Sequence, residues 1–299
     1  MSRLKKILAN FFSKKENDIE VPSQSFLDAI NKLQISAQQG NSEDQVKLGL
    51  LYLQKGYPND LLIAKDWLEK SAHQGNRDAE YNFALLYYDG LGVPQDYNIA
   101  EYWFTKSAHQ GLSKAQYNLG IMYDYGLGVT RNVKIAVKWL EQAAQQGHVQ
   151  AQNNLGYLYM SDVDLPHDYK LAKYWLEQAL KQDNANAQLN MGILYFQGLG
   201  VSEDLNLAKY WFEKSAQQGN EIAEYNLGMI FKSAENYELA IKWFQKSADN
   251  NNPEAQLQLG LFYYQGLGIQ VDKVKAIEWI QKSAQQGNET AIAIINSLE

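Results

Sequence analysis

Residues 115–147 decide the fold; they read AQYNLGIMYDYGLGVTRNVKIAVKWLEQAAQQG. This stretch combines a Leu-Gly step, a Gly-Leu-Gly step and an Ala-x-x-Trp step. Glycines at such spacings sometimes cradle phosphates, so the stretch is either a nucleotide-binding loop or a piece of architecture. The choice depends on whether the pattern recurs elsewhere in the chain, because repeats are the first feature to test.

The pattern does recur, with a period that the tryptophans mark. Their spacings are 36, 36, 36, 36, 32 and 36 residues. The shorter step arises between Phe231 and Ala240, where KSAENYEL is four residues shorter than its counterpart FQGLGVSEDLNL. One loop is therefore trimmed while both flanking helices keep their length. The tryptophans are Trp67, Trp103, Trp139, Trp175, Trp211, Trp243 and Trp279.

Each unit of the repeat contains two helical patterns. The first places small or apolar residues at relative positions 0, 4, 5 and 8, and the second at 0, 3, 4, 7 and 8. We predict two short amphipathic helices per unit, and neither can bury its apolar stripe alone, so the units must stack into a solenoid. In residues 115–147 these positions are Ala115, Leu119, Gly120 and Tyr123, then Ala136, Trp139, Leu140, Ala143 and Ala144.

This frame resembles the Sel-one-like repeat (SLR), a 36-residue relative of the tetratricopeptide repeat. About seven copies cover residues 41–288. Residues 23–40 resemble a lone second helix that caps the array, and residues 289–299 resemble a C-terminal cap helix. Residues 1–22 form a basic amphipathic arm and a linker. The resemblance implies an all-α fold, a right-handed α-solenoid of helix-turn-helix repeats.

The paired glycines fit this architecture better than a phosphate site. Gly126 and Gly128 recur in three other copies, without the preceding strand, third glycine or Lys-Ser/Thr that a phosphate loop needs. We expect the first glycine to end a helix with positive φ and the second to turn the chain into the next helix. The closing glycine is replaced by Asp183 and Asn251 in two copies, and both residue types tolerate the left-handed conformation.

Composition and charge narrow the classes of partner. The net charge is −7, and because residues 1–15 hold five basic and no acidic residues, the rest of the chain carries −12. Nucleic acid is therefore disfavoured, and a basic protein partner is favoured. The chain has no cysteine. We find no catalytic, cofactor-binding or metal-binding pattern, and expect no cofactor and no enzymatic activity.

The arm is open to more than one interpretation. Leu4, Ile7, Leu8, Phe11 and Phe12 follow a helical spacing beside several basic residues. Residues 1–15 could rest on an anionic membrane surface, cap the first repeat or be disordered. No stretch approaches the length of a membrane span, and the signal-peptide pattern is incomplete. We expect a cytoplasmic protein, with peripheral contact at the inner membrane as the alternative.

The candidate binding surface follows from the resemblance, because the first helix of such repeats lines a concave groove. One position there holds asparagine, whose amide can hydrogen-bond an extended peptide or the repeat array itself. These residues are Asn82, Asn118, Asn154, Asn190 and Asn226, and the position before them adds Tyr81, Tyr117 and Tyr225.

For two further positions of the first helix we predict opposite solvent exposure. The position running from Leu50 to Leu261 is apolar in every copy, so we expect it to be buried between repeats. Another position varies from Asp124 to Lys232, so packing does not dictate it and we expect it to be exposed. It would present an apolar strip along the groove, of a kind that marks partner sites. The strip consists of Tyr88, Met160, Phe196 and Tyr264.

The sequence thus predicts a non-enzymatic scaffold that recognises a protein or peptide segment. The family resemblance and the acidic body suggest a bacterial immunity protein that covers a toxin. A signalling or assembly adaptor, held at the membrane by the arm, is the nearest alternative. Some cysteine-rich members of the family are linked to penicillin binding or β-lactam hydrolysis, so a β-lactamase-like hydrolase is a distant third. This chain has none of their cysteines.

Overall fold

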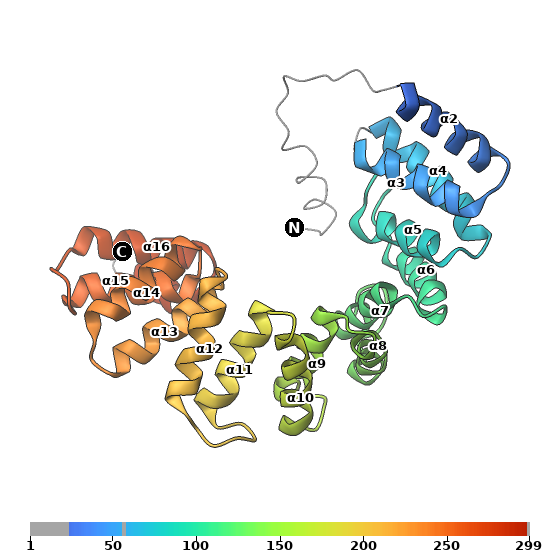
Figure 1. The fold of residues 1–299 in the computed structure, drawn as a ribbon. Coiled ribbons are helices and arrows are strands. Elements are labelled where there is room, and N and C mark those ends of the chain that lie inside the picture. Colours follow the sequence, from blue (N-terminus) through green and yellow to red (C-terminus); the bar gives the residue numbers. More distant parts are fainter. Residues whose placement is uncertain (1–23, 56–57, 298–299) are drawn as a thin grey trace. The chain divides into compact units, whose positions relative to one another are not determined.

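The computed structural model describes residues 24–55 and 58–297. The arm and the alternatives for residues 1–15 lie outside the described residues. Within them every regular element is a helix (Figure 1), so the predicted all-α class is confirmed. The first helices are α3 (Ser42–Lys55), α5 (Arg77–Asp89), α7 (Ser113–Tyr125), α9 (Val149–Ser161), α11 (Ala185–Gln197), α13 (Glu221–Ser233) and α15 (Pro253–Gln265).

Each first helix is followed by a second helix, and one further helix lies at either end of the described chain. The second helices are α4 (Pro58–His73), α6 (Tyr97–His109), α8 (Val133–Gln145), α10 (Tyr169–Leu180), α12 (Leu205–Gln217), α14 (Tyr237–Asp249) and α16 (Lys273–Gln285). The end helices are α2 (Gln24–Gln38) and α17 (Glu289–Asn296).

The chain forms two compact units, Met1–Ala151 and Gln152–Glu299, which we call unit 1 and unit 2. In unit 1 each of α2 to α7 packs on the helix that follows it, and in unit 2 the same holds from α10 to α16. Sequential packing of this kind is the pattern of a solenoid, because each repeat contacts its neighbours along the chain.

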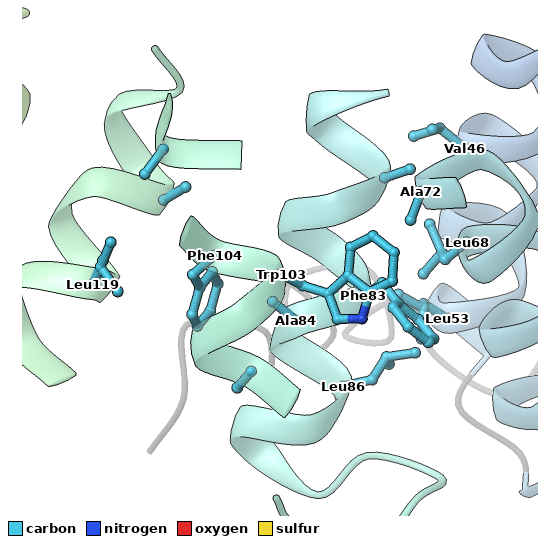
Figure 2. Packing of buried hydrophobic residues seen from close by; sticks show 14 of the residues in the cluster. Val46, Leu53, Leu68, Ala72, Phe83, Ala84, Leu86, Trp103, Phe104 and Leu119 are labelled. Atoms are coloured by element: carbon cyan, nitrogen blue, oxygen red, sulfur yellow. The ribbon is translucent and has the colours of Figure 1, made fainter. Parts of the chain in front are cut away.

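The two helices of a repeat approach closely because the Leu-Gly step carries no side chain there. A Cβ placed on Gly120 of α7 would stand 2.7 Å from Cγ of Leu140 in α8. Large side chains of the second helix fill the space beyond this contact. In unit 1, Trp103 packs beside Phe83 and close to Leu53 and Leu86 (Figure 2), and it is 6% exposed. Trp175 is also buried and the other five tryptophans are half-buried, so the periodic tryptophan contributes to packing to different degrees.

The Gly-Leu-Gly loop joins consecutive repeats. Gly126 ends α7 in the left-handed conformation, with φ of 71°, and its N–H donates to the carbonyl of Met122. Gly128, with φ of 69°, lies against Tyr97, the first residue of the preceding second helix. The architectural interpretation of these glycines is confirmed.

The residues that replace the closing glycine of the repeat also end helices. Asp183 and Asn251 adopt positive φ angles of 52° and 66°, as their replacement of the closing glycine predicts. The trimmed loop adds Glu235, with φ of 56°, which the sequence does not predict. Its N–H donates to the carbonyl of Lys232, so the loss of four residues is absorbed by one tight turn.

Candidate functional site

The first helices share a partly exposed side, defined by two positions of the repeat. One position directly follows the Leu-Gly step, and the other holds asparagine three residues earlier. Residues three apart are neighbours on a helix surface. We call this side the first-helix face. The residues after the Leu-Gly step are Leu50, Leu85, Ile121, Tyr157, Ile193, Met229 and Leu261.

In unit 2, side chains connect neighbouring first helices. The side-chain amide of Asn190 in α11 donates to Oδ1 of Asn153 in α9 at 3.0 Å. The ammonium group of Lys232 in α13 donates to Oε1 of Gln258 in α15 at 2.7 Å. Between these pairs, α11 and α13 share one buried apolar cluster. Side-chain contacts therefore link the first helices α9, α11, α13 and α15 in sequence.

The apolar position after the Leu-Gly step is accessible, so the prediction that it is buried between repeats is wrong. Tyr157 is 53% exposed and Leu50 is 40% exposed, and the other five residues are half-buried. The neighbouring repeats cover the residue before the glycine instead, such as Leu119 and Leu227. Sequence reasoning missed these residues as site candidates, although their unbroken apolar character was the signal.

The asparagine position is divided between internal bonds and half-buried side chains. Asn190 is 6% exposed and bonds to Asn153, and Asn82 donates to the carbonyl of Asp78 at 2.7 Å in its own helix. For these two, the alternative of bonding within the repeat array holds. Asn154 also bonds within the array, because its Oδ1 accepts from the side-chain amide of Asn153 at 3.3 Å. Asn118 and Asn226 are half-buried.

The tyrosines before the asparagines are half-buried and serve packing. Tyr81 and Tyr225 lie against phenylalanines of their own repeats, with ring centroids 5.7 and 5.9 Å apart. Burial raises the pKa of the Tyr225 hydroxyl. Tyr117 stacks on His148 with ring centroids 4.6 Å apart.

The variable position gives a mixed outcome. Phe196 and Tyr264 are 39% and 50% exposed, as predicted. Met160 is only 6% exposed, so its predicted exposure is wrong. Tyr88 is half-buried against Tyr97, and burial raises the pKa of its hydroxyl to about 12. The position lies on the flank of the helix, so its exposure depends on which neighbouring side chain covers it; the predicted strip is interrupted.

A ladder of part-buried side-chain hydrogen bonds, which sequence reasoning also missed, joins the two helices of every repeat. A side-chain amide just after the second helix donates to a buried residue of the first helix, at 2.7 to 3.4 Å. The signal was the recurring Gln before the closing glycine. The donor and acceptor pairs are Gln74–Gln45, Gln110–Glu80, Gln146–Gln116, Gln182–Gln152, Gln218–Gln188, Asn250–Glu224 and Gln286–Gln256.

Two members of the ladder are carboxylates. Glu80 and Glu224 are fully buried, and each faces a lysine of the following second helix. Nζ of Lys106 lies 3.7 Å from Oε1 of Glu80, and Nζ of Lys246 lies 3.0 Å from Oε1 of Glu224. Burial raises the pKa of Glu80, and the nearby Lys106 opposes that rise in part. Because each carboxylate sits in a repeat position that glutamine fills elsewhere, both have a structural role.

The described side chains offer little for catalysis. They contain no group of three or more His, Asp or Glu residues that could hold a metal ion. Within the same residues, every helix is too short or too polar to cross a bilayer. What the first-helix face of unit 2 offers is apolar surface beside amides, an arrangement that can bind a polypeptide through side-chain burial and backbone hydrogen bonds.

Comparisons with proteins of known structure identify other helical repeat proteins. The chain is similar to a Sel1 repeat protein from Oxalobacter formigenes, at 32% identity and a TM-score of 0.73, over 80% of this chain and 96% of the other. It is also similar to a protective antigen of uropathogenic Escherichia coli with an SLR fold, at 32% identity and a TM-score of 0.54, over 90% of this chain and 67% of the other.

A more distant similarity joins the chain to an immunity protein from Pseudomonas aeruginosa. It has 19% identity and a TM-score of 0.51, over 71% of this chain and 82% of the other, and shows a shared fold. No curated protein matches the sequence. The Sel1 repeat matches seven consecutive segments, residues 42–76, 77–112, 113–148, 149–184, 185–220, 222–252 and 253–288. The chain therefore belongs to the Sel1 repeat family.

Proposed function

We propose that this chain is a scaffold whose first-helix face in unit 2 binds a segment of a partner protein. Sel1 repeats typically mediate protein–protein interaction. The observation that carries the proposal is the accessible apolar residue after the Leu-Gly step on α9, α11, α13 and α15. Tyr157 is exposed and its three counterparts are half-buried, so part of an apolar row stays in contact with water unless a partner covers it.

The chemistry of this face suits an extended segment. Tyr157 and Phe196 supply large apolar anchors, which contribute disproportionately to interface energies. The half-buried amides of Asn154 and Asn226 lie beside the apolar residues and can exchange hydrogen bonds with a peptide backbone. Bonds to the backbone would bring affinity, and the aromatic anchors would select the side chains of the partner.

The partner is expected to be a bacterial toxin, which the chain would cover and neutralise. The acidic net charge of −7 favours a basic partner. The shared fold with the immunity protein from Pseudomonas aeruginosa makes this partner class a reasonable first test. A tight one-to-one complex that protects cells from one toxin would support it. Weak binding to several unrelated segments would instead indicate an adaptor.

The partner can be found by photo-crosslinking in the source cells. A photoreactive phenylalanine analogue at Ile193 would sit on the first-helix face, and the same analogue at Leu207 of α12 would sit on a second helix of the same unit. Leu207 is 39% exposed and Ile193 is half-buried, so the control position is the more accessible of the two. A protein that crosslinks at Ile193 but not at Leu207 is the candidate partner.

With the purified partner, we expect Tyr157→Ala to weaken binding at least about tenfold, because loss of one aromatic anchor typically costs more than 1 kcal/mol. Tyr174→Ala is the matched control, since Tyr157 and Tyr174 are 53% and 50% exposed in the same unit. Isothermal titration calorimetry measures both. Equal effects of the two replacements would show that the partner does not use the first-helix face.

A further inference from the structure

The first and last described helices each correspond to one half of a repeat. In α2, residues 36–40 read SAQQG, which matches the SAHQG that ends the second helix α4 at residues 71–75. α17 starts as first helices do, because the side chain of Asn288 accepts from the N–H of Ala291, as that of Asn252 does at the start of α15. Among the described residues, α2 therefore has no first helix and α17 has no second helix to pair with.

Within a complete repeat, two polar positions face each other across the helix pair. One is the first-helix residue that accepts the ladder bond, which is polar in all seven repeats and at most 6% exposed. The other lies three residues after the tryptophan of the second helix and is lysine or glutamine throughout. Three such pairs lie 3.0 to 3.7 Å apart, namely Glu80 with Lys106, Gln116 with Gln142, and Glu224 with Lys246.

Both positions hold isoleucine in the two unpaired helices. Ile292 occupies the ladder position of α17 and is 38% exposed, and Ile35 occupies the facing position of α2 and is 55% exposed. Leu33 of α2 is half-buried, although the seven residues at its position in the second helices are at most 2% exposed. Terminal repeats of a solenoid ordinarily have a polar outer face. Here apolar residues stand at the two places where the described chain supplies no facing helix.

We propose that α17 of one chain pairs with α2 of a second copy and so completes a repeat between the two molecules. Ile292 of one copy then packs against Ile35 of the other, in the place of the polar pairs found inside the chain. The interface continues the helix pairing that the repeats establish within the molecule. Burial of the two isoleucine side chains away from water favours the contact. Because a first helix pairs with a second helix, each end matches the opposite end of another copy.

One position limits how closely the two helices approach. Asn296 stands in α17 where the Leu-Gly glycine stands in most first helices. A side chain at this position is compatible with pairing, since α5 carries Ala84 there and still packs on α6. Asn296 is the last residue of α17, so its larger side chain widens the contact at one end only. We therefore expect a weak head-to-tail association, whose open ends allow more than two copies to join.

Sedimentation velocity of the full chain tests the proposal. An interface of one helix pair is small, so we expect association at protein concentrations between about 10 µM and about 1 mM. The weight-average mass should rise with concentration and pass that of a dimer, because a head-to-tail contact leaves an unpaired α2 and an unpaired α17 in every open assembly. A chain that stays monomeric, as it would if residues 1–22 covered α2, overturns the proposal, and so does a mass that stops at two copies.

Charge replacements at the two isoleucines locate the contact. Ile35→Lys and Ile292→Glu should each weaken association at least about fivefold, because either one places a charge against an apolar partner. Together in one chain they recreate the pair formed by Lys106 and Glu80, so the double variant should associate at least about fivefold more strongly than either single variant. A double variant that associates no more strongly than the single variants contradicts the pairing.

Two further variants complete the test. Ile222→Glu is the matched control and should leave association unchanged, since Ile222 is 44% exposed and belongs to α13, within an internal repeat. Asn296→Gly should strengthen association at least about threefold, because it restores the glycine that admits a facing helix. Circular dichroism checks that each variant keeps its helical content. Equal association of Ile222→Glu and Ile292→Glu, or no gain in Asn296→Gly, overturns the proposal.

Discussion

At the scale of single residues, Gly128 and Gly147 adopt nearly the same backbone conformation in different surroundings. Their φ angles are 69° and 83°. A Cβ on Gly128 would stand 2.5 Å from Cβ of Tyr97, whereas a Cβ on Gly147 would have nothing within 4 Å. The comparison separates two costs of replacing glycine, the left-handed backbone and the collision with the preceding repeat.

We expect Gly147→Ala to destabilise the chain by about 1 kcal/mol, the usual cost of left-handed φ for a residue with a Cβ. Gly128→Ala should cost about 2 to 4 kcal/mol, because overpacking against Tyr97 adds to that strain. Urea unfolding followed by circular dichroism measures both, with hydrogen exchange to locate the loss in unit 1. An equal loss of unfolding free energy in the two variants would show that Gly128 does not pack against Tyr97 of the preceding helix.

At the scale of the helix pair, the part-buried amide ladder explains why Gln-Gly follows the second helix. Each amide donor reaches a first-helix side chain thirty residues earlier, except for 29 in the first repeat and 26 in the trimmed repeat. Breaking such a bond leaves the buried acceptor of the first helix unsatisfied, at a cost of about 1 to 3 kcal/mol. The ladder therefore fixes the register between the two helices.

Glu80→Gln tests the charge in this ladder. Burial raises the pKa of Glu80 above its ordinary value of 4.5, so the folded state favours the protonated acid. The stability that this group contributes is greatest below pH 4.5 and is lost as the pH rises through the raised pKa. We expect Glu80→Gln to raise stability by about 1 kcal/mol at pH 7 and by less at pH 4. Thermal unfolding at both pH values measures the difference.

The reciprocal variant is Gln116→Glu. The position of Lys106 is occupied there by Gln142, which accepts a hydrogen bond from Gln116 at 3.1 Å. A new carboxylate would be buried without a cation, at a cost of about 3 kcal/mol at pH 7 that should fall towards pH 4. If both variants behaved the same at the two pH values, the ladder position would be hydrated and the burial argument would fail.

At the scale of the whole molecule, stability is expected to be a sum over repeats and their neighbours. Removing one complete repeat should therefore leave a foldable chain. Residues 185–220 form one repeat of unit 2, with α11 and α12. Their deletion joins Asn184 to Glu221, and Asn184 caps the helix after it as Asn220 does. The junction therefore keeps both its cap and its helix order.

We expect this 36-residue deletion to unfold cooperatively at a lower temperature than the full chain. Deletion of residues 185–202 is the control, because it removes α11 alone and places the second helix α10 directly before the second helix α12. That variant should lose helical content and sharp unfolding, since neither helix offers the glycine that the other needs for close approach. Circular dichroism measures both variants. Retention of cooperative folding by the control would contradict the nearest-neighbour description.

The period of the tryptophans, the Leu-Gly step and the Gly-Leu-Gly loop determined the repeat, the helix pairs and the helix ends from sequence alone. They could do so because these features are local. Asp183 and Asn251 end helices for the same reason that glycine does, and that reason lies in their own backbone conformation. The family, the all-α class and the structural role of the paired glycines followed directly.

Only the tertiary structure decided which side chains reach solvent. A helical pattern tells which side of its own helix a residue occupies, but exposure depends on what the neighbouring helices place over that side. Met160 was expected outside and is buried, and Tyr157 was expected inside and is exposed. Asn190 finds its partner Asn153 one repeat away, 37 residues along the chain. Such contacts form only when repeats stack. The sequence alone therefore predicts the helical scaffold, whereas the packing of its helices determines which side chains form the surface.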